Sequence, residues 1–162
     1  MQPVIFVFYL FIAFTMGLSG DIDDDIAERM AQFLLMSKTD VQICINKTYV
    51  NTSLIKEDLM RLDQFVDDNI ETIDIDKSIL KVGCLGACLL QKKELMSSIY
   101  INEVKLKEFV NSISDYRYKP EQDRILNICI DRVKSKSNEC EIIFKLIQCA
   151  ISETRRLMRG MQ

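Results

Sequence analysis

The sequence predicts an all-α protein, a compact domain of six amphipathic helices linked by disulfides. Apolar residues recur at intervals of three or four along most of the chain after residue 20, which is the spacing of one face of a helix. The whole chain has only five glycines and two prolines, residues that interrupt helices, and six cysteines lie among the helical stretches. The segment that alternates most like a strand, residues 70–75, has no second strand to pair with, so we expect an extended connection there.

The first 19 residues are predicted to be a secretory signal peptide. Pro3 to Leu18 is an uncharged, strongly apolar run of 16 residues. A membrane-spanning helix needs roughly 20 such residues, whereas a run of this length suits the core of a signal peptide. Small residues favour cleavage near Ser19 and Gly20, and an uncleaved anchor is the alternative. Residues 20–162 then form one domain of a secreted, extracellular protein.

The six cysteines predict three disulfides, because a secreted chain folds in an oxidising compartment and their number is even. Cys84 and Cys88 are four residues apart in an apolar stretch, so on a helix both thiols lie on one face and can reach two different helices. Cys140 and Cys149 lie on opposite sides of one helix and cannot bond each other. The spacing leaves the other pairings open, and two unpaired buried cysteines are the alternative at 84 and 88.

The composition argues against an enzyme, a metal centre and a nucleic-acid partner. The chain has no histidine, the residue type that most often serves as a general base and a metal ligand. It also has no cysteine pair at the two-residue spacing of zinc sites. A net charge of −3 lacks the basic excess that nucleic-acid binding needs. We therefore expect no catalytic residue, no metal and no cofactor.

The first helix is expected to begin after a run of aspartates, Asp21 to Asp25, which places negative charge at the positive end of the helix dipole. Apolar residues follow at helical spacing from Ile26. We expect this helix to bend or break between Ser37 and Asp40, before Cys44. A second helix is expected from about Ser53, and it stops at three polar residues, 67–69.

Two N-glycosylation motifs lie between these helices. Asn46-Lys47-Thr48 and Asn51-Thr52-Ser53 both match the acceptor pattern. Asn46 and Asn51 are therefore candidate glycosylation sites in a secreted chain.

The third helix is expected to start at Asp76 as its N-cap, to carry Cys84 and Cys88, and to end between Lys92 and Ser98. Gly86 in its middle costs about 1 kcal/mol relative to alanine, which indicates either the close approach of another backbone or simple tolerance. Asn102 is expected to open a fourth helix with an apolar stripe at Leu106, Phe109, Val110 and Ile113.

The fifth and sixth helices are predicted from residues that are typical of the first turn of a helix. Pro120 suits the first turn of the fifth helix, whose inward face is predicted at Ile125, Ile128, Cys129 and Val133. Lys134 to Asn138 is a polar loop, and Glu139 begins the last helix. The inward face of that helix is predicted at Cys140, Ile143, Phe144, Ile147 and Ile151.

The cysteine spacing resembles that of the insect odorant-binding protein family, also called pheromone-binding proteins. Three residues separate Cys84 from Cys88, 40 separate Cys88 from Cys129, 10 separate Cys129 from Cys140, and 8 separate Cys140 from Cys149. The likeness covers nearly all of the chain after the signal peptide. Two features depart from the family pattern: the 39 residues between Cys44 and Cys84, and the pair of glycosylation motifs.

The resemblance implies a six-helix fold around an internal apolar cavity that carries small volatile ligands through an aqueous sensory fluid. It also implies the disulfides Cys44–Cys88, Cys84–Cys140 and Cys129–Cys149. The expected partners are a small hydrophobic ligand and, as a candidate, a membrane chemoreceptor, with the protein a monomer or weak homodimer.

The leading hypothesis for function is a secreted carrier that reversibly binds an odorant, a pheromone or a related lipid. Apolar residues at inward positions are candidates to line the cavity, although most would serve equally as ordinary core: Leu59, Phe65, Leu80, Leu89, Leu95, Met96, Tyr100, Phe109, Ile113, Ile128, Phe144, Ile147 and Ile151. Tyr116 and Tyr118 are candidate polar anchors. The alternative is a secreted helical signalling protein that acts on a receptor through its surface.

Overall fold

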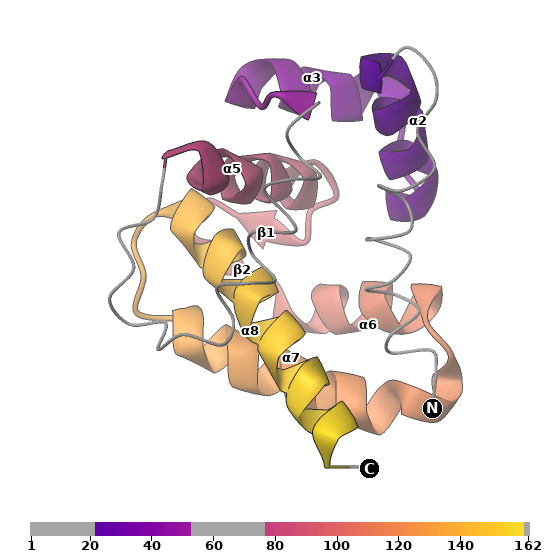
Figure 1. Cartoon of the computed structure of the whole chain (residues 1–162), viewed down its shortest axis with the longest axis vertical. Coiled ribbons are helices and arrows are strands. Elements are labelled where there is room, and N and C mark those ends of the chain that lie inside the picture. Colours follow the sequence, from indigo (N-terminus) through magenta and orange to yellow (C-terminus); the bar gives the residue numbers. More distant parts are fainter. Residues whose placement is uncertain (1–21, 53–76, 161–162) are drawn as a thin grey trace.

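A computed structural model describes residues 22–52 and 77–160 of the chain, and almost all of this part is helical (Figure 1). The elements in order are α2 (Ile22–Leu34), α3 (Lys38–Thr48), α5 (Lys77–Lys92), β1 (Met96–Ser97), β2 (Tyr100–Ile101), α6 (Glu103–Ile113), the 3-10 turn η1 (Tyr116–Tyr118), α7 (Lys119–Val133) and α8 (Glu139–Arg159). The all-α prediction is confirmed. Within the described ranges, no helix is long and apolar enough to cross a membrane.

Several predictions from the sequence fall outside the described residues. These are the signal peptide at residues 1–19, the helix expected from Ser53, the extended connection at 70–75 and the cap at Asp76.

The expected break in the first helical stretch lies at residues 35–37, between α2 and α3. Leu35 adopts a left-handed conformation with φ 52°, and the Met36 amide donates to the carbonyl of Ala31 at 3.0 Å, which closes the end of α2. The Ser37 hydroxyl then accepts a hydrogen bond from the Asp40 amide at 3.1 Å and caps α3. This local chemistry turns the chain so that α3 lies beside α5 (Figure 1).

The start signals of the later helices are also confirmed. The Asn102 side chain accepts from the Lys105 amide at 3.0 Å at the start of α6, and Asn138 does the same for the Glu141 amide at 3.1 Å at the start of α8. Pro120 lies in the first turn of α7, where its missing amide hydrogen costs nothing.

A short hairpin between α5 and α6 was not predicted. β1 and β2 pair antiparallel, with Met96 opposite Ile101 and Ser97 opposite Tyr100. Ser98 in the two-residue turn has φ 52°, which turns the chain back on itself. Strands of two residues are too short to leave a periodic pattern in the sequence, and this hairpin does not change the all-α class of the fold.

The helices α5 and α8 pack closely along two glycines of α5. A Cβ atom on Gly83 would overlap the carbonyl oxygen of Cys140, so the backbones of the two helices meet at this position. A Cβ atom on Gly86 would instead lie 2.7 Å from Cγ2 of Ile143, which is a side-chain contact. The close backbone approach considered for Gly86 is therefore found one turn earlier, at Gly83.

Three disulfides tie the helices together, and all six cysteines take part. Cys44–Cys88 joins α3 to α5, Cys84–Cys140 joins α5 to the first turn of α8, and Cys129–Cys149 joins α7 to α8. These are the pairs that the family resemblance implied. Cys84 and Cys88 thus reach two different helices from one face of α5, and neither is an unpaired core residue.

Candidate ligand-binding interior

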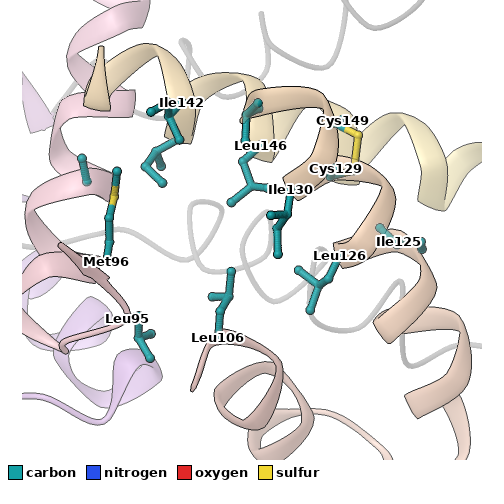
Figure 2. Close-up of a cluster of buried hydrophobic side chains, with 13 residues drawn as sticks. Leu95, Met96, Leu106, Ile125, Leu126, Cys129, Ile130, Ile142, Leu146 and Cys149 are labelled. Carbon is teal, nitrogen blue, oxygen red and sulfur yellow. A yellow bond between two sulfur atoms is a disulfide. The ribbon is translucent and has the colours of Figure 1, made fainter. Parts of the chain in front are cut away.

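A cluster of buried apolar side chains lies where α5, the hairpin, α6, α7 and α8 meet (Figure 2). We call it the main interior cluster. It consists of Ala87, Leu95, Met96, Leu106, Ile125, Leu126, Cys129, Ile130, Val133, Ile142, Ile143, Leu146 and Cys149. No member carries a charge or a hydroxyl group, so this interior suits apolar surface only.

The periodicity of three helices directs these side chains inward. Ile142, Leu146 and Cys149 recur at intervals of four and three on α8 and form one face of it. In Figure 2, Leu106 points from α6 toward Ile130 on α7 and Leu146 on α8. The main interior cluster is thus assembled from several short segments rather than from one pair of helices.

A second, smaller cluster lies between α2, α3 and α5 and contains Ala27, Val41, Cys44, Leu85, Cys88 and Leu89 among others. Phe109 of α6 packs against both clusters and so joins them. The Lys93 ammonium lies 4.8 Å from the centroid of the Phe109 ring and also donates to the carbonyl of Leu35 at 3.4 Å. This cation covers the half-buried ring at the edge between the two clusters.

The structure brings some of the predicted cavity residues to the main interior cluster and leaves others elsewhere. Leu95 and Met96 belong to it, and Phe109, Ile128 and Ile147 pack against it. Leu89 belongs to the smaller cluster. The remaining helical candidates lie outside both clusters, with Phe144 buried and the others half-buried: Leu80, Ile113, Phe144 and Ile151. Leu59 and Phe65 lie outside the described residues.

Two of the three predicted tyrosines are exposed. Tyr100 and Tyr116 are 72% and 82% exposed, because β2 is at the tip of the hairpin and η1 is a surface turn. Neither side chain belongs to the main interior cluster or packs against it. Tyr118 is half-buried, and the Arg117 guanidinium lies 5.9 Å from the centroid of its ring.

Five members of the main interior cluster on α7 and α8 were not among the predicted inward positions: Leu126, Ile130, Ile142, Leu146 and Cys149. The helices α7 and α8 are each buried on a wide arc, because both pack between other elements. Apolar residues at these positions were visible in the sequence. The spacing of apolar residues did not show which of two apolar faces of each helix would contact the main interior cluster.

Buried polar groups lie on α7 and α8 but are not members of the cluster. Glu153 is 7% exposed and accepts from the Arg132 guanidinium at 2.9 Å, while the other Arg132 nitrogen lies 3.4 Å from the sulfur of Cys149. Gln148 is 2% exposed, and its Oε1 atom has no hydrogen-bond partner. Within residues 22–52 and 77–160, no group of acidic side chains or cysteines could hold a metal ion.

Displaced pKa values occur at the surface rather than in the cluster. A bidentate hydrogen bond from Arg117 lowers the pKa of Asp115 to about 2. A hydrogen bond from Ser37, followed by the nearby Lys92, lowers the pKa of Asp40. Burial, followed by repulsion from Lys136, lowers the pKa of Lys145. The main interior cluster therefore presents no titrating group to a bound molecule.

The model of the PBP/GOBP family matches residues 26–153, from the first turns of α2 to the second half of α8. The chain belongs to the PBP/GOBP family. It is also similar to the pheromone-binding protein Gp-9 of Solenopsis quinquecuspis, Solenopsis invicta and Solenopsis richteri, with 28% identity over 102 residues in each case. That match covers 62% of this chain and spans 65% of the length of these relatives. No solved structure matches the sequence significantly.

Membership of the PBP/GOBP family confirms the resemblance drawn from the cysteine spacing. The matched residues include all six cysteines and therefore the three disulfides that hold the interior together. The names of these relatives state that they bind pheromones.

Proposed function

We propose that this protein is a secreted carrier that reversibly binds a small hydrophobic ligand, such as an odorant, a pheromone or a related lipid, inside the bundle. The observation that carries the proposal is the main interior cluster of apolar side chains supplied by α5, the hairpin, α6, α7 and α8, in a chain of the PBP/GOBP family. Catalysis is not part of the proposed role.

The chemistry of the cluster selects the class of ligand. Aliphatic side chains and the Met96 thioether offer dispersion contacts and no charge, so an ionic group of a ligand would lose its hydration without compensation. Burying about 250 Å² of ligand surface contributes roughly 6 kcal/mol before the entropy cost of association. This contribution corresponds to a dissociation constant of some tens of micromolar at best, and such weak binding suits a carrier that must also release its cargo.

The disulfides are consistent with a carrier, because they would offset the cost of an internal cavity. An internal cavity costs roughly 24 cal/mol per Å³, so one of a few hundred Å³ would destabilise the fold by several kcal/mol. Cross-links over separations of 20, 44 and 56 residues each contribute about 3 to 4 kcal/mol in the chain-entropy model. The two contributions are of similar size.

Secretion is the second part of the proposal. Residues 1–19 have the length and apolarity of a signal peptide. A signal peptide directs the chain into an oxidising compartment, where disulfides form and persist. Expression of the full chain in insect cells, with N-terminal sequencing of the protein in the medium, tests this part. The expected mature N-terminus is Gly20 or a close neighbour, and retention of Met1 on a membrane-bound protein would contradict it.

The ligand-binding part is tested by displacement of a fluorescent apolar probe from the oxidised protein, with a panel of volatiles and fatty acids as competitors. We expect micromolar probe affinity and a severalfold loss in Phe109→Ala, because this ring joins the two apolar clusters. Tyr116→Ala is the control, since its side chain is 82% exposed and should not affect the probe. If the folded protein takes up no probe at micromolar concentration, a signalling role through the surface becomes the better account.

A further inference from the structure

Tyr49 is an exposed aromatic residue in a strained backbone conformation. It follows the last residue of α3 with φ 52°, and its amide donates to the carbonyl of Asn46 at 3.4 Å. The side chain is 81% exposed. A left-handed conformation costs a residue with a side chain roughly 1 to 2 kcal/mol, and most proteins place glycine or asparagine at this position. The ring therefore projects into solvent from a position where a smaller residue would fit better.

A glycosylation motif begins two residues after this ring. Asn51 is exposed, lies beyond the end of α3, and opens the sequence Asn51-Thr52-Ser53. Two residues of chain span at most about 7 Å, so Asn51 cannot lie farther than this from Tyr49 along the backbone, and the Tyr49 ring is within reach of the first sugar of a glycan on Asn51. The face of a pyranose ring carries several C–H groups and packs well on an aromatic ring, which offers an apolar surface of similar size.

We propose that Asn51 is N-glycosylated and that the first sugar of the glycan packs on the ring of Tyr49. This inference rests on the proposed secretion, because the sugar donor is a lipid pyrophosphate oligosaccharide of the secretory pathway. In the transfer, the Asn51 amide nitrogen forms a bond to C1 of the first sugar. The bond from C1 to the pyrophosphate oxygen breaks, the lipid pyrophosphate leaves, and the amide loses one proton.

The neighbouring motif at Asn46 is a poorer acceptor in this structure. Asn46 and Thr48 both lie within α3, where residues two apart project about 200° away from each other. The Thr48 hydroxyl donates to the carbonyl of Cys44 at 2.8 Å and is held against the helix. The residue two positions before Asn46 is Cys44, which is fully buried in a disulfide and offers no ring for a sugar.

The site is tested by mass spectrometry of the full chain secreted by insect cells, before and after treatment with peptide N-glycosidase. We expect the wild-type protein and Asn46→Gln to lose the mass of one glycan on treatment, and Asn51→Gln to lose none. Wild-type protein in the medium without a glycan would overturn the inference. A glycan that persists in Asn51→Gln and disappears in Asn46→Gln would overturn it equally.

The contact with the ring is tested with Tyr49→Ala, and Tyr116→Ala serves as the control because that ring is equally exposed but far from either motif in the sequence. We expect Tyr49→Ala to lower the occupancy of Asn51 and to lower the Tm of the glycosylated protein more than that of the enzymatically deglycosylated protein. Equal effects on both forms, or none, would overturn the proposed packing on Tyr49.

These outcomes separate the inference from the proposed function. Secreted protein without a glycan removes the modification site and leaves the carrier role intact, because probe binding is measured on deglycosylated protein as well. Protein that stays on the membrane with residues 1–19 attached and carries no glycan overturns both secretion and the modification. Absence of probe binding to a secreted, glycosylated protein overturns the carrier role alone.

Discussion

Gly83 of α5 lies directly against the carbonyl oxygen of Cys140 in α8, with no room for a Cβ atom between the two helices. The adjacent residue, Cys84, forms a disulfide with the same Cys140. The close backbone approach and the cross-link therefore occur together, and they fix where α8 begins relative to α5. This contact positions Ile142, Ile143 and Leu146, three members of the main interior cluster that follow Cys140 on α8.

Replacing Gly83 by alanine is expected to destabilise the protein by about 1 to 3 kcal/mol, because the added methyl group meets backbone that the disulfide holds in place. Gly86→Ala is the matched control on the same helix. There the methyl group meets the Ile143 side chain rather than backbone, and alanine gains about 1 kcal/mol in helix propensity, which offsets part of the cost of the contact. Denaturant unfolding should show the larger loss for Gly83→Ala; equal losses would contradict the assigned backbone contact.

The disulfide pairing is expected to be interlocked. Peptide mapping without reduction should yield Cys44–Cys88, Cys84–Cys140 and Cys129–Cys149. Paired replacement of Cys129 and Cys149 by serine should lower stability by about 3 kcal/mol, and paired replacement of Cys84 and Cys140 by about 4 kcal/mol, because the second bridge closes the longer loop. A bond between Cys84 and Cys88 in the native protein would rule out the pairing described above.

Local signals in the sequence predicted helix boundaries well. Ser37, Asn102 and Asn138 each cap a helix with a side-chain oxygen that accepts a hydrogen bond from the amide three residues on, so a signal of this kind spans only three or four consecutive residues. The disulfide pairing was obtained differently, from the resemblance to a family, because the spacing by itself left several pairings open.

Features that depend on tertiary packing were predicted less well. The sequence does not show whether the apolar face at Ile142 and Leu146 or the one at Phe144 meets the main interior cluster, since that depends on where α7 lies. Gly83 and Gly86 look alike in the sequence, and only their neighbours on α8 distinguish them. Tyr116 was predicted to be a polar anchor because of its hydroxyl group. The structure places it in a surface turn of three residues, where its side chain is exposed.

The ion pair between Arg132 and Glu153 should matter more than those at the surface. Because Glu153 is buried, replacing Arg132 by methionine leaves a carboxylate without its partner, at an expected cost of about 1 to 3 kcal/mol near neutral pH. Adding Glu153→Gln should recover part of this loss. The control is Lys105→Met, which breaks an exposed pair with Glu94 and should change the free energy of unfolding by about 0.5 kcal/mol or less.

The absence of histidine predicts little response to pH in the neutral range. Asp115 and Asp40 have lowered pKa values, which places their protonation even further below neutrality. Ligand affinity is therefore expected to stay nearly constant between about pH 7.5 and pH 6, with any loss near pH 4 to 5 as ordinary carboxylates protonate. A drop of about tenfold or more between pH 7 and pH 6, at fixed ionic strength, would show that a carboxylate titrates there.

Stability should respond to Asp115 only in acid. Its pKa falls from 3.8 to about 2 on folding, because Arg117 binds the ionised form. Its contribution is therefore fully present above pH 3.8 and is lost as the pH falls through about 2. The Tm of Asp115→Asn should lie below that of the wild type by a constant amount from about pH 7.5 to pH 5, and the difference should shrink toward pH 2. A difference that disappears already near pH 6 would contradict this assignment.

The central claim, that the apolar interior is where the ligand binds, is tested most directly by methyl NMR with a ligand from the displacement assay at saturating concentration. The account predicts intermolecular NOEs from the ligand to the methyl groups of Met96, Leu106 and Leu146, which belong to the main interior cluster. The exposed methyl groups of Leu35 and Val104, which are 68% and 66% accessible, should show none. Intermolecular NOEs confined to the exposed methyl groups, with none to the cluster, would contradict the account.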